Sequence, residues 1–105
     1  MQIQVNTDAN IEGNEKLIAE IEATVIDALS HHSGQITHVE VHLSDENGHK
    51  KGRNDKRCMM EARVAGRRPM AVTCEAGTVD EAISGAAERL KKTLESTLDR
   101  LSERR

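Results

Sequence analysis

The residues of this sequence best suited to chemistry are a run of cations between Lys50 and Arg68. The run holds eight basic side chains against two acidic ones, Asp55 and Glu61. Clustered charge of one sign creates a local potential that attracts a polyanion even when the whole protein is acidic. Lysine and arginine also bind phosphates and release the counterions around them. The run therefore predicts a polyanion-binding surface, and the alternative is a solvated loop and hairpin with incidental charge.

The remaining charge is divided unevenly along the chain. Residues 1–49 hold one basic and nine acidic side chains, whereas residues 50–105 hold fourteen basic and nine acidic ones. The acidic first half has a simple interpretation as a solvated face, and it would also repel a polyanion on that side of the molecule.

The chain contains no Trp, Tyr or Phe. Its core must therefore consist of aliphatic side chains, methionine and alanine. Bases of a single-stranded nucleic acid could not stack on such a protein, because stacking needs aromatic rings. The composition instead favours recognition of folded RNA through its shape and backbone.

Histidines and cysteines raise the question of metal binding or catalysis. No paired C-x-x-C spacing is present, and His38 and His42 lie roughly 13 Å apart along one predicted strand, too far to share one metal. Strand alternation places Cys58 inward, so we expect Cys58 and Cys74 to be buried thiols and not nucleophiles. We therefore predict no metal, no cofactor, no small-molecule substrate and no enzymatic activity. The remaining histidines, which we interpret as exposed, are His31, His32 and His49.

Hydrophobic periodicity predicts the elements that must position these residues. Alternating apolar side chains predict strands over 2–6, 36–44, 57–65 and 70–75, while residues 45–56 contain no apolar side chain and predict a solvated loop. Residues 66–68 form the predicted hairpin turn before Pro69.

Two amphipathic helices complete the predicted order. The first covers residues 15 to about 31, begins at Asn14 as N-cap and closes at Gly34; its apolar positions include Ile26. The second begins at a capping box, Thr78 to Glu81, and is long. The order β-α-β-β-β-α predicts an α+β fold, a two-layer sandwich with a four-stranded mixed sheet and two helices on one face.

Length and hydropathy set the organisation of the chain. Its 105 residues fit a single domain, residues 1–105. No apolar run is long enough to span a membrane, and the N-terminus does not resemble a secretory signal. We therefore expect a cytoplasmic protein with no membrane partner.

The whole chain resembles the bacterial ribosome hibernation-promoting factors, also called ribosome-associated inhibitors or sigma-54 modulation proteins. The stretches that carry the resemblance are ITHVEVHLSDENG, DKRCMMEARVAGRRPMAVTCEA and AISGAAERLKKTL. The resemblance implies a fold like that of double-stranded-RNA-binding domains. It also implies a short form, without the dimerisation domain of longer members.

The resemblance further implies a function. Such a protein would bind the small ribosomal subunit through 16S rRNA near the decoding centre, block the mRNA and tRNA sites, and silence translation in stationary phase or stress. Arg89 and Lys92 match basic positions of the family's second helix, and Lys91 lies between them. The full set of predicted RNA-binding residues is Lys50, Lys51, Arg53, Lys56, Arg57, Arg67, Arg68, Arg89, Lys91 and Lys92.

An alternative function remains open from sequence. The basic hairpin could instead bind an acidic protein partner, in which case the chain would be a small protein-interaction module. The sequence leaves self-association undecided, and it does not tell whether ribosomes would be silenced singly or in pairs.

Overall fold

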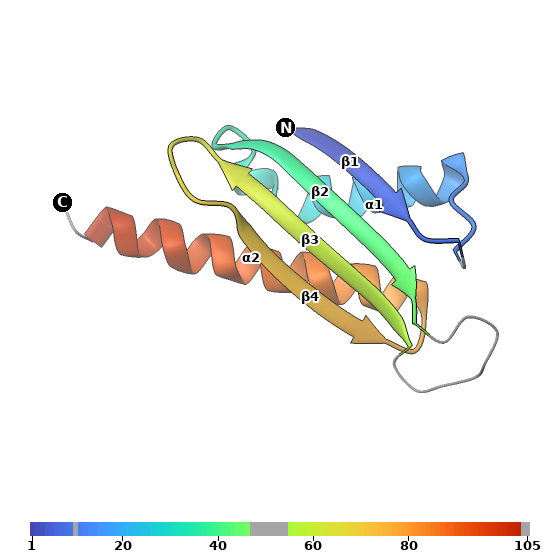
Figure 1. Ribbon diagram of the computed structural model, residues 1–105. Coiled ribbons are helices and arrows are strands. Elements are labelled where there is room, and N and C mark those ends of the chain that lie inside the picture. The colour runs from blue at the N-terminus through green and yellow to red at the C-terminus, as the bar shows by residue number, and fades with distance from the viewer. Residues whose placement is uncertain (10, 47–54, 104–105) are drawn as a thin grey trace.

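The computed structural model describes residues 1–9, 11–46 and 55–103, and the side chains up to residue 100. Seven elements follow one another along the chain, in the predicted order apart from one added 3-10 turn (Figure 1). They are β1 (Gln2–Thr7), α1 (Glu15–Ala28), a 3-10 turn (Ser30–His32), β2 (Ile36–Asp45), β3 (Lys56–Val64), β4 (Met70–Ala76) and α2 (Val79–Glu103).

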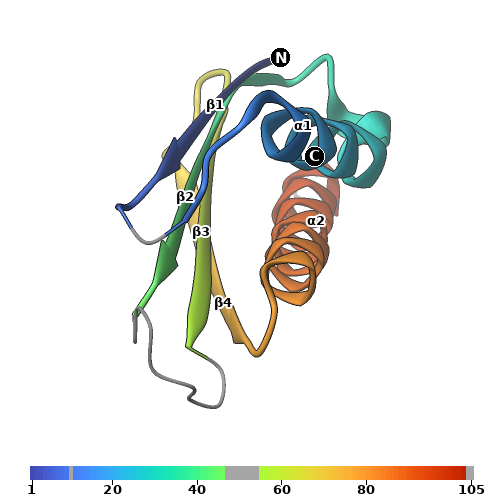
Figure 2. The same ribbon diagram turned by 90° about the vertical axis from the view of Figure 1, so that its right-hand side faces the viewer.

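The four strands form one sheet in the order β1-β2-β3-β4. β1 runs parallel to β2 because the chain crosses through α1 between them, and the other two pairs are antiparallel. Both helices cover one face of this mixed sheet and leave the other face open (Figure 2). The predicted α+β two-layer fold is therefore confirmed.

The core lies between the sheet and the helices. Alternate residues of the central strands, such as Val41 and Met60, are fully buried there, as are Ile21 of α1 and Leu90 of α2. Gly85 allows a close approach of α2 to β4, because a Cβ at this position would collide with the Sγ of Cys74. The small residue thus brings α2 down onto the edge strand β4.

Local side-chain bonds start both helices: the predicted N-cap of α1 is present, and so is the threonine half of the capping box predicted for α2. The side chain of Asn14 accepts a hydrogen bond of 2.8 Å from the backbone N–H of Leu17. The hydroxyl of Thr78 accepts one of 3.2 Å from the N–H of Glu81 and donates to the carboxylate of the same residue.

The structure corrects the predicted end of the first helix. α1 ends at Ala28 and passes into the 3-10 turn, so Gly34 does not close it, and the only described glycine with a positive φ is Gly66. The periodicity predicts that Ile26 faces the core, but this side chain is 52% exposed. Ala19 and Ala23, seven and three residues before Ile26, are exposed as well, so Ile26 lies on the solvent-facing side of α1. These apolar residues on the outer side hide its exposure from an analysis of hydrophobic periodicity.

The predicted loop over residues 45–56 is also too long at both ends. Asp45 is the last residue of β2 and Lys56 is the first of β3, where the two are paired across the sheet. Asp45 and Asp55 are both buried. These residues form an ionic cluster that extends the paired strands, and sequence periodicity does not reveal it.

Candidate nucleic-acid interface

The basic run of residues 50–68 does not form one patch. β3 spans nine residues, about 26 Å of extended chain, so its two ends lie at opposite ends of the sheet (Figure 1). Lys56 is at one end, whereas Arg67 and Arg68 follow the other. The predicted ligands Lys50, Lys51 and Arg53 lie outside the described residues.

Lys56 is bound by carboxylates of its own chain. Its Nζ lies 3.0 Å from Oδ1 of Asp55 and 3.4 Å from Oδ2 of Asp45. The hydrogen bond to Asp55 and the second carboxylate raise the pKa of Lys56 above its ordinary 10.5. A further carboxylate, Asp8, accepts a bond of 3.1 Å from the backbone N–H of Asp45. Lys56 thus stabilises the end of the sheet, and its charge is already neutralised before any phosphate approaches.

The two arginines within β3 also face carboxylates. Arg57 lies 3.8 Å from Glu46, and Arg63 lies 3.7 Å from Glu61. Both pairs are exposed on the open face of the sheet, where such pairs contribute little to stability. They nevertheless reduce the local positive potential that a phosphate would meet.

The open face of the sheet carries mixed charge. Glu40 and Glu61 are directly paired across β2 and β3 at its centre, and His42 lies 3.9 Å from Glu40. Two adjacent carboxylates repel phosphate. This face is therefore a poor candidate for RNA contact.

The turn between β3 and β4 presents two arginines without such neighbours. The N–H of Arg67 donates to the oxygen of Val64 at 3.0 Å, and Gly66 supplies the positive φ of 73° that this tight turn needs. Arg67 and Arg68 are exposed at the tip. Within the described part of the chain, neither has an ion-pair partner.

The basic residues of α2 divide between two flanks of the helix. At about 100° per residue, Lys91 points some 200° away from Arg89, whereas Lys92 lies within about 60° of Arg89. Arg89 donates through Nη1 to the backbone oxygen of Thr73 in β4. Arg89 and Lys92 therefore share the flank beside the edge strand, and Lys91 faces the side of α1.

Sequence reasoning missed one cation on that flank. Arg100 stands eleven residues after Arg89, just over three full turns, and thus lies on the same side of α2. It is exposed, and its Nε donates to the oxygen of Ser96 at 3.4 Å. The eleven-residue spacing was the signal that could have identified it.

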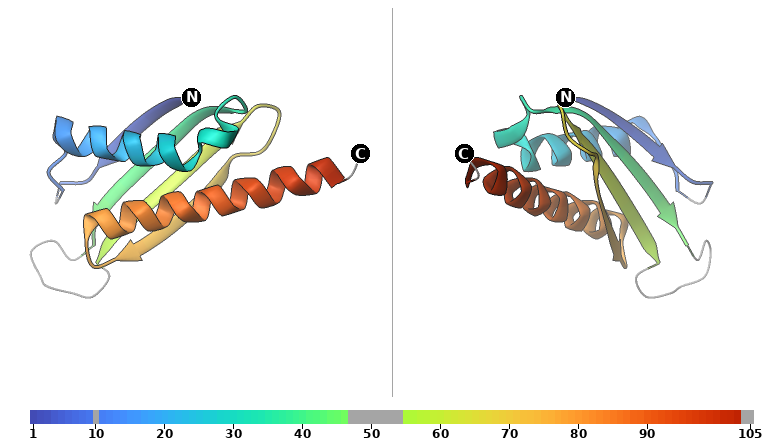
Figure 3. Two further views of the ribbon diagram at one scale, coloured as in Figure 1. Left: turned by 180° about the vertical axis from the view of Figure 1, so that it is seen from behind. Right: turned by 60° about the vertical axis from the view of Figure 1, so that its left-hand side comes forward.

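The hairpin and the second half of α2 occupy one end of the molecule. α2 is about 37 Å long against about 23 Å for β4, so it extends past the sheet on the side of the β3–β4 turn (Figures 1 and 3). We call this the basic end and define it by Arg67, Arg68, Lys92 and Arg100; it also contains the carboxylates of Glu95 and Asp99. Arg89 lies nearer the middle of α2, beside Thr73 of β4.

Residues suited to catalysis or metal binding do not converge in the described ranges. No group of three or more His, Cys, Asp or Glu residues there is arranged to hold a metal ion. Cys58 and Cys74 are buried and directly opposite each other across β3 and β4, as predicted for structural thiols. Burial, with a smaller effect of Cys74, raises the pKa of the Cys58 thiol to about 12, which disfavours Cys58 as a nucleophile at neutral pH.

Comparison with known proteins identifies the class to which this fold belongs. Residues 3–102 match the family described as sigma 54 modulation protein / S30EA ribosomal protein. The match covers nearly the whole chain, and this protein belongs to that family of ribosome-associated proteins. A search of curated protein sequences gave no significant match.

Two solved structures share the fold. The N-terminal domain of Protein Y from Thermus thermophilus superposes with a TM-score of 0.73 at 20% identity, covering 92% of this chain and 99% of that one. A ribosomal subunit interface protein from Coxiella burnetii superposes with a TM-score of 0.78 at 11% identity, covering 94% and 99%. No helix in the described residues is long and apolar enough to cross a membrane.

Proposed function

We propose that this protein is a hibernation factor that binds the small ribosomal subunit and silences translation. It would contact 16S rRNA near the decoding centre and occupy the sites of mRNA and tRNA. The observation that carries the proposal is the family match over residues 3–102. The fold shared with the ribosomal subunit interface protein from Coxiella burnetii supports it. Action on ribosomes would place the protein in the cytoplasm.

The basic end is the surface we propose for rRNA. Arg67 and Arg68 project from a tight turn, which suits insertion of two guanidinium groups between phosphates. Lys92 and Arg100 would extend the contact along α2. Because the chain has no aromatic side chain, recognition would rest on phosphate positions and RNA shape instead of base stacking.

The proposed role is binding and not catalysis. Cys58 is buried, and its thiol has a pKa of about 12. In the described residues, the histidines do not belong to any group of three or more side chains that could hold a metal ion. Silencing by occupation of a site needs only affinity and position. Lys50, Lys51 and Arg53 would add to the affinity if they reach the RNA.

Sedimentation with ribosomes tests this function. In a stationary-phase extract at low salt, the protein should travel with small subunits or whole ribosomes, and its addition to a cell-free system should lower translation. If the protein stays at the top of the gradient, the proposal fails. If it travels instead with an acidic protein free of ribosomes, the alternative role as a protein-interaction module takes its place.

A further inference from the structure

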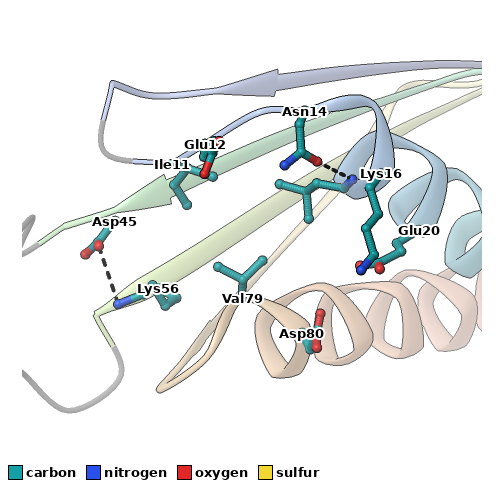
Figure 4. Close-up of a pocket in the computed structure, with 10 residues that line it drawn as sticks. Ile11, Glu12, Asn14, Lys16, Glu20, Asp45, Lys56, Val79 and Asp80 are labelled. Atoms are coloured by element: carbon teal, nitrogen blue, oxygen red, sulfur yellow. Dashed lines mark hydrogen bonds and ion pairs between the residues drawn. The ribbon is translucent and has the colours of Figure 1, made fainter.

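A groove runs between α1 and the first half of α2 on the helix side of the molecule. Two cavities of about 380 and 370 Å³ lie along it. Glu20 and Asp80 line both cavities, so the two are neighbours, and we refer to them together as the groove. The groove lies at the end of the molecule where both helices begin (Figures 3 and 4).

Apolar side chains form much of the groove's lining. Ile11, Leu17 and Val79 line its first cavity, and each is only half-buried. Ala23 and Ile83 line the second. Aliphatic surface therefore stays open to solvent between two packed helices, as in grooves that accept a side chain of a partner.

Carboxylates border this apolar lining. Glu12, Glu20 and Asp80 are exposed around the groove, and in Figure 4 the ammonium of Lys16 points toward Glu20. The other lining cation, Lys56, is already bound by Asp45 and Asp55. Within the described part of the chain, the groove thus offers little unpaired positive charge to an incoming anion.

The helix dipoles do not reverse this charge. The N-termini of α1 and α2 both lie at this end and together contribute about one positive charge. Among the described residues, five carboxylates belong to the groove or to the first turns beside it, against Lys16 and the already paired Lys56. The carboxylates are those of Glu12, Glu15, Glu20, Asp80 and Glu81. The groove therefore remains negative and is complementary to a cationic ligand.

We propose that this groove binds a lysine- or arginine-rich segment of a partner protein. Basic side chains of the segment would pair with Glu20 and Asp80, while an aliphatic side chain would pack on Leu17 and Val79. RNA is a poor occupant, because its phosphates would meet these carboxylates. The inference goes beyond the proposed function and does not depend on it, since the basic end lies at the opposite end of α2.

A titration of the isotope-labelled full chain tests the proposal. The probe is a short capped peptide of alternating Lys and Leu, added at about 0.15 M salt so that distant charges are screened. We expect the backbone amide signals of Leu17, Glu20, Val79 and Asp80 to shift together and saturably. A matched peptide with Gln in place of Lys should cause no such shifts.

Charge-neutral variants separate the groove from general electrostatics. Glu20→Gln with Asp80→Asn should weaken peptide binding about tenfold. The control, Glu75→Gln with Glu88→Gln, removes the same charge from exposed positions outside the groove and should change the affinity less than twofold. Arg67→Gln with Arg68→Gln should also leave peptide binding unchanged, even if ribosome binding is lost.

Three outcomes would overturn the proposal. Equal weakening by the groove and control variants would reduce the effect to net charge. Amide shifts confined to other surfaces would place the peptide elsewhere. Concentration-dependent self-association of the wild type that the groove variant abolishes would make a second copy of this chain the occupant instead of a partner protein.

Discussion

Arg89 of α2 donates a hydrogen bond to the backbone oxygen of Thr73, which fastens the helix to the edge strand β4. The sequence predicts only a role in RNA binding for Arg89. The contact adds a structural role. The guanidinium takes up a backbone acceptor of the edge strand β4, which hinders the pairing of β4 with a strand of another molecule. Lys92, one turn farther along the same flank, is exposed and makes no such bond with the described residues.

Substitution of Arg89 and of Lys92 should therefore differ in effect. Arg89→Ala should lower the free energy of unfolding by about 1 kcal/mol, the usual contribution of one hydrogen bond, and also weaken ribosome binding. Lys92→Ala should weaken ribosome binding and change stability by no more than about 0.5 kcal/mol. Urea denaturation followed by far-UV circular dichroism measures the first quantity, since the chain has no tryptophan to observe. Equal stability of the two variants would show that the Thr73 contact is unimportant.

Gly85 should be intolerant of a side chain for a steric reason. Gly85→Ala would place a Cβ against the Sγ of Cys74, and the repacking should cost about 1–3 kcal/mol of stability. Gly77→Ala is the control, because a Cβ there meets nothing within 4 Å.

A second substitution identifies the clash itself. Cys74→Ala removes the opposing sulfur, so Gly85→Ala should cost much less in the Cys74→Ala background than in the wild type. The same cost in both backgrounds would mean that another contact, and not Cys74, limits this position.

Stability should fall in alkaline solution because of Cys58. The unfolded thiol loses its proton near 9, whereas the folded thiol has a pKa of about 12, so the folded state binds more protons between these values. The contribution of Cys58 to the free energy of unfolding is fully present below pH 9. Above pH 9 it decreases by up to about 1.4 kcal/mol per pH unit. The chain contains no tyrosine to add its own titration.

Urea midpoints at pH 8, 9 and 10 test this for the wild type and Cys58→Ala. The wild type should lose stability over this range, and the variant should follow a flatter curve. Parallel curves would exclude Cys58 as the cause. Data above pH 10.5 serve less well, because Lys56 then adds a decline of the same sign through its own raised pKa.

The Lys56 cluster should matter more than the other basic pairs of β3. Lys56→Met leaves Asp45 and Asp55 buried without their shared cation and should destabilise the fold strongly at neutral pH. Arg57→Met, which breaks only an exposed pair with Glu46, should cost no more than about 1 kcal/mol. A reversed order would contradict the structural role of Lys56.

The element order could be predicted from sequence because each element has its own local signal. Alternation of Val39, Val41 and Leu43 marks a strand, and the Thr78–Glu81 capping box marks the start of α2. The ends of residues 45–56 could not be predicted, since a stretch without apolar side chains indicates a loop. Burial of Asp45 and Asp55 depends on a lysine that reaches them only in the folded sheet.

The candidate interface was predictable only in part. The sequence groups Lys56 with Arg67 and Arg68, but an extended strand separates them by most of the sheet. Conversely, Arg67 and Arg100 are distant in sequence, and the fold brings their segments to one end of the molecule (Figure 1). Cations that are close in sequence therefore do not form one patch here, because the extended strand β3 lies between them.

The central claim is that the basic end binds the ribosome, and quantitative binding to purified small subunits tests it most directly. Arg67→Glu with Arg68→Glu should weaken binding at least about tenfold and leave the thermal midpoint nearly unchanged. The slope of the logarithm of the binding constant against the logarithm of the salt concentration should become shallower by about two, one for each lost phosphate contact. Arg57→Glu with Arg63→Glu makes the same charge change on the open sheet face and should have a much smaller effect. Equal losses from both pairs, or undiminished binding after reversal at Arg67 and Arg68, would contradict the claim.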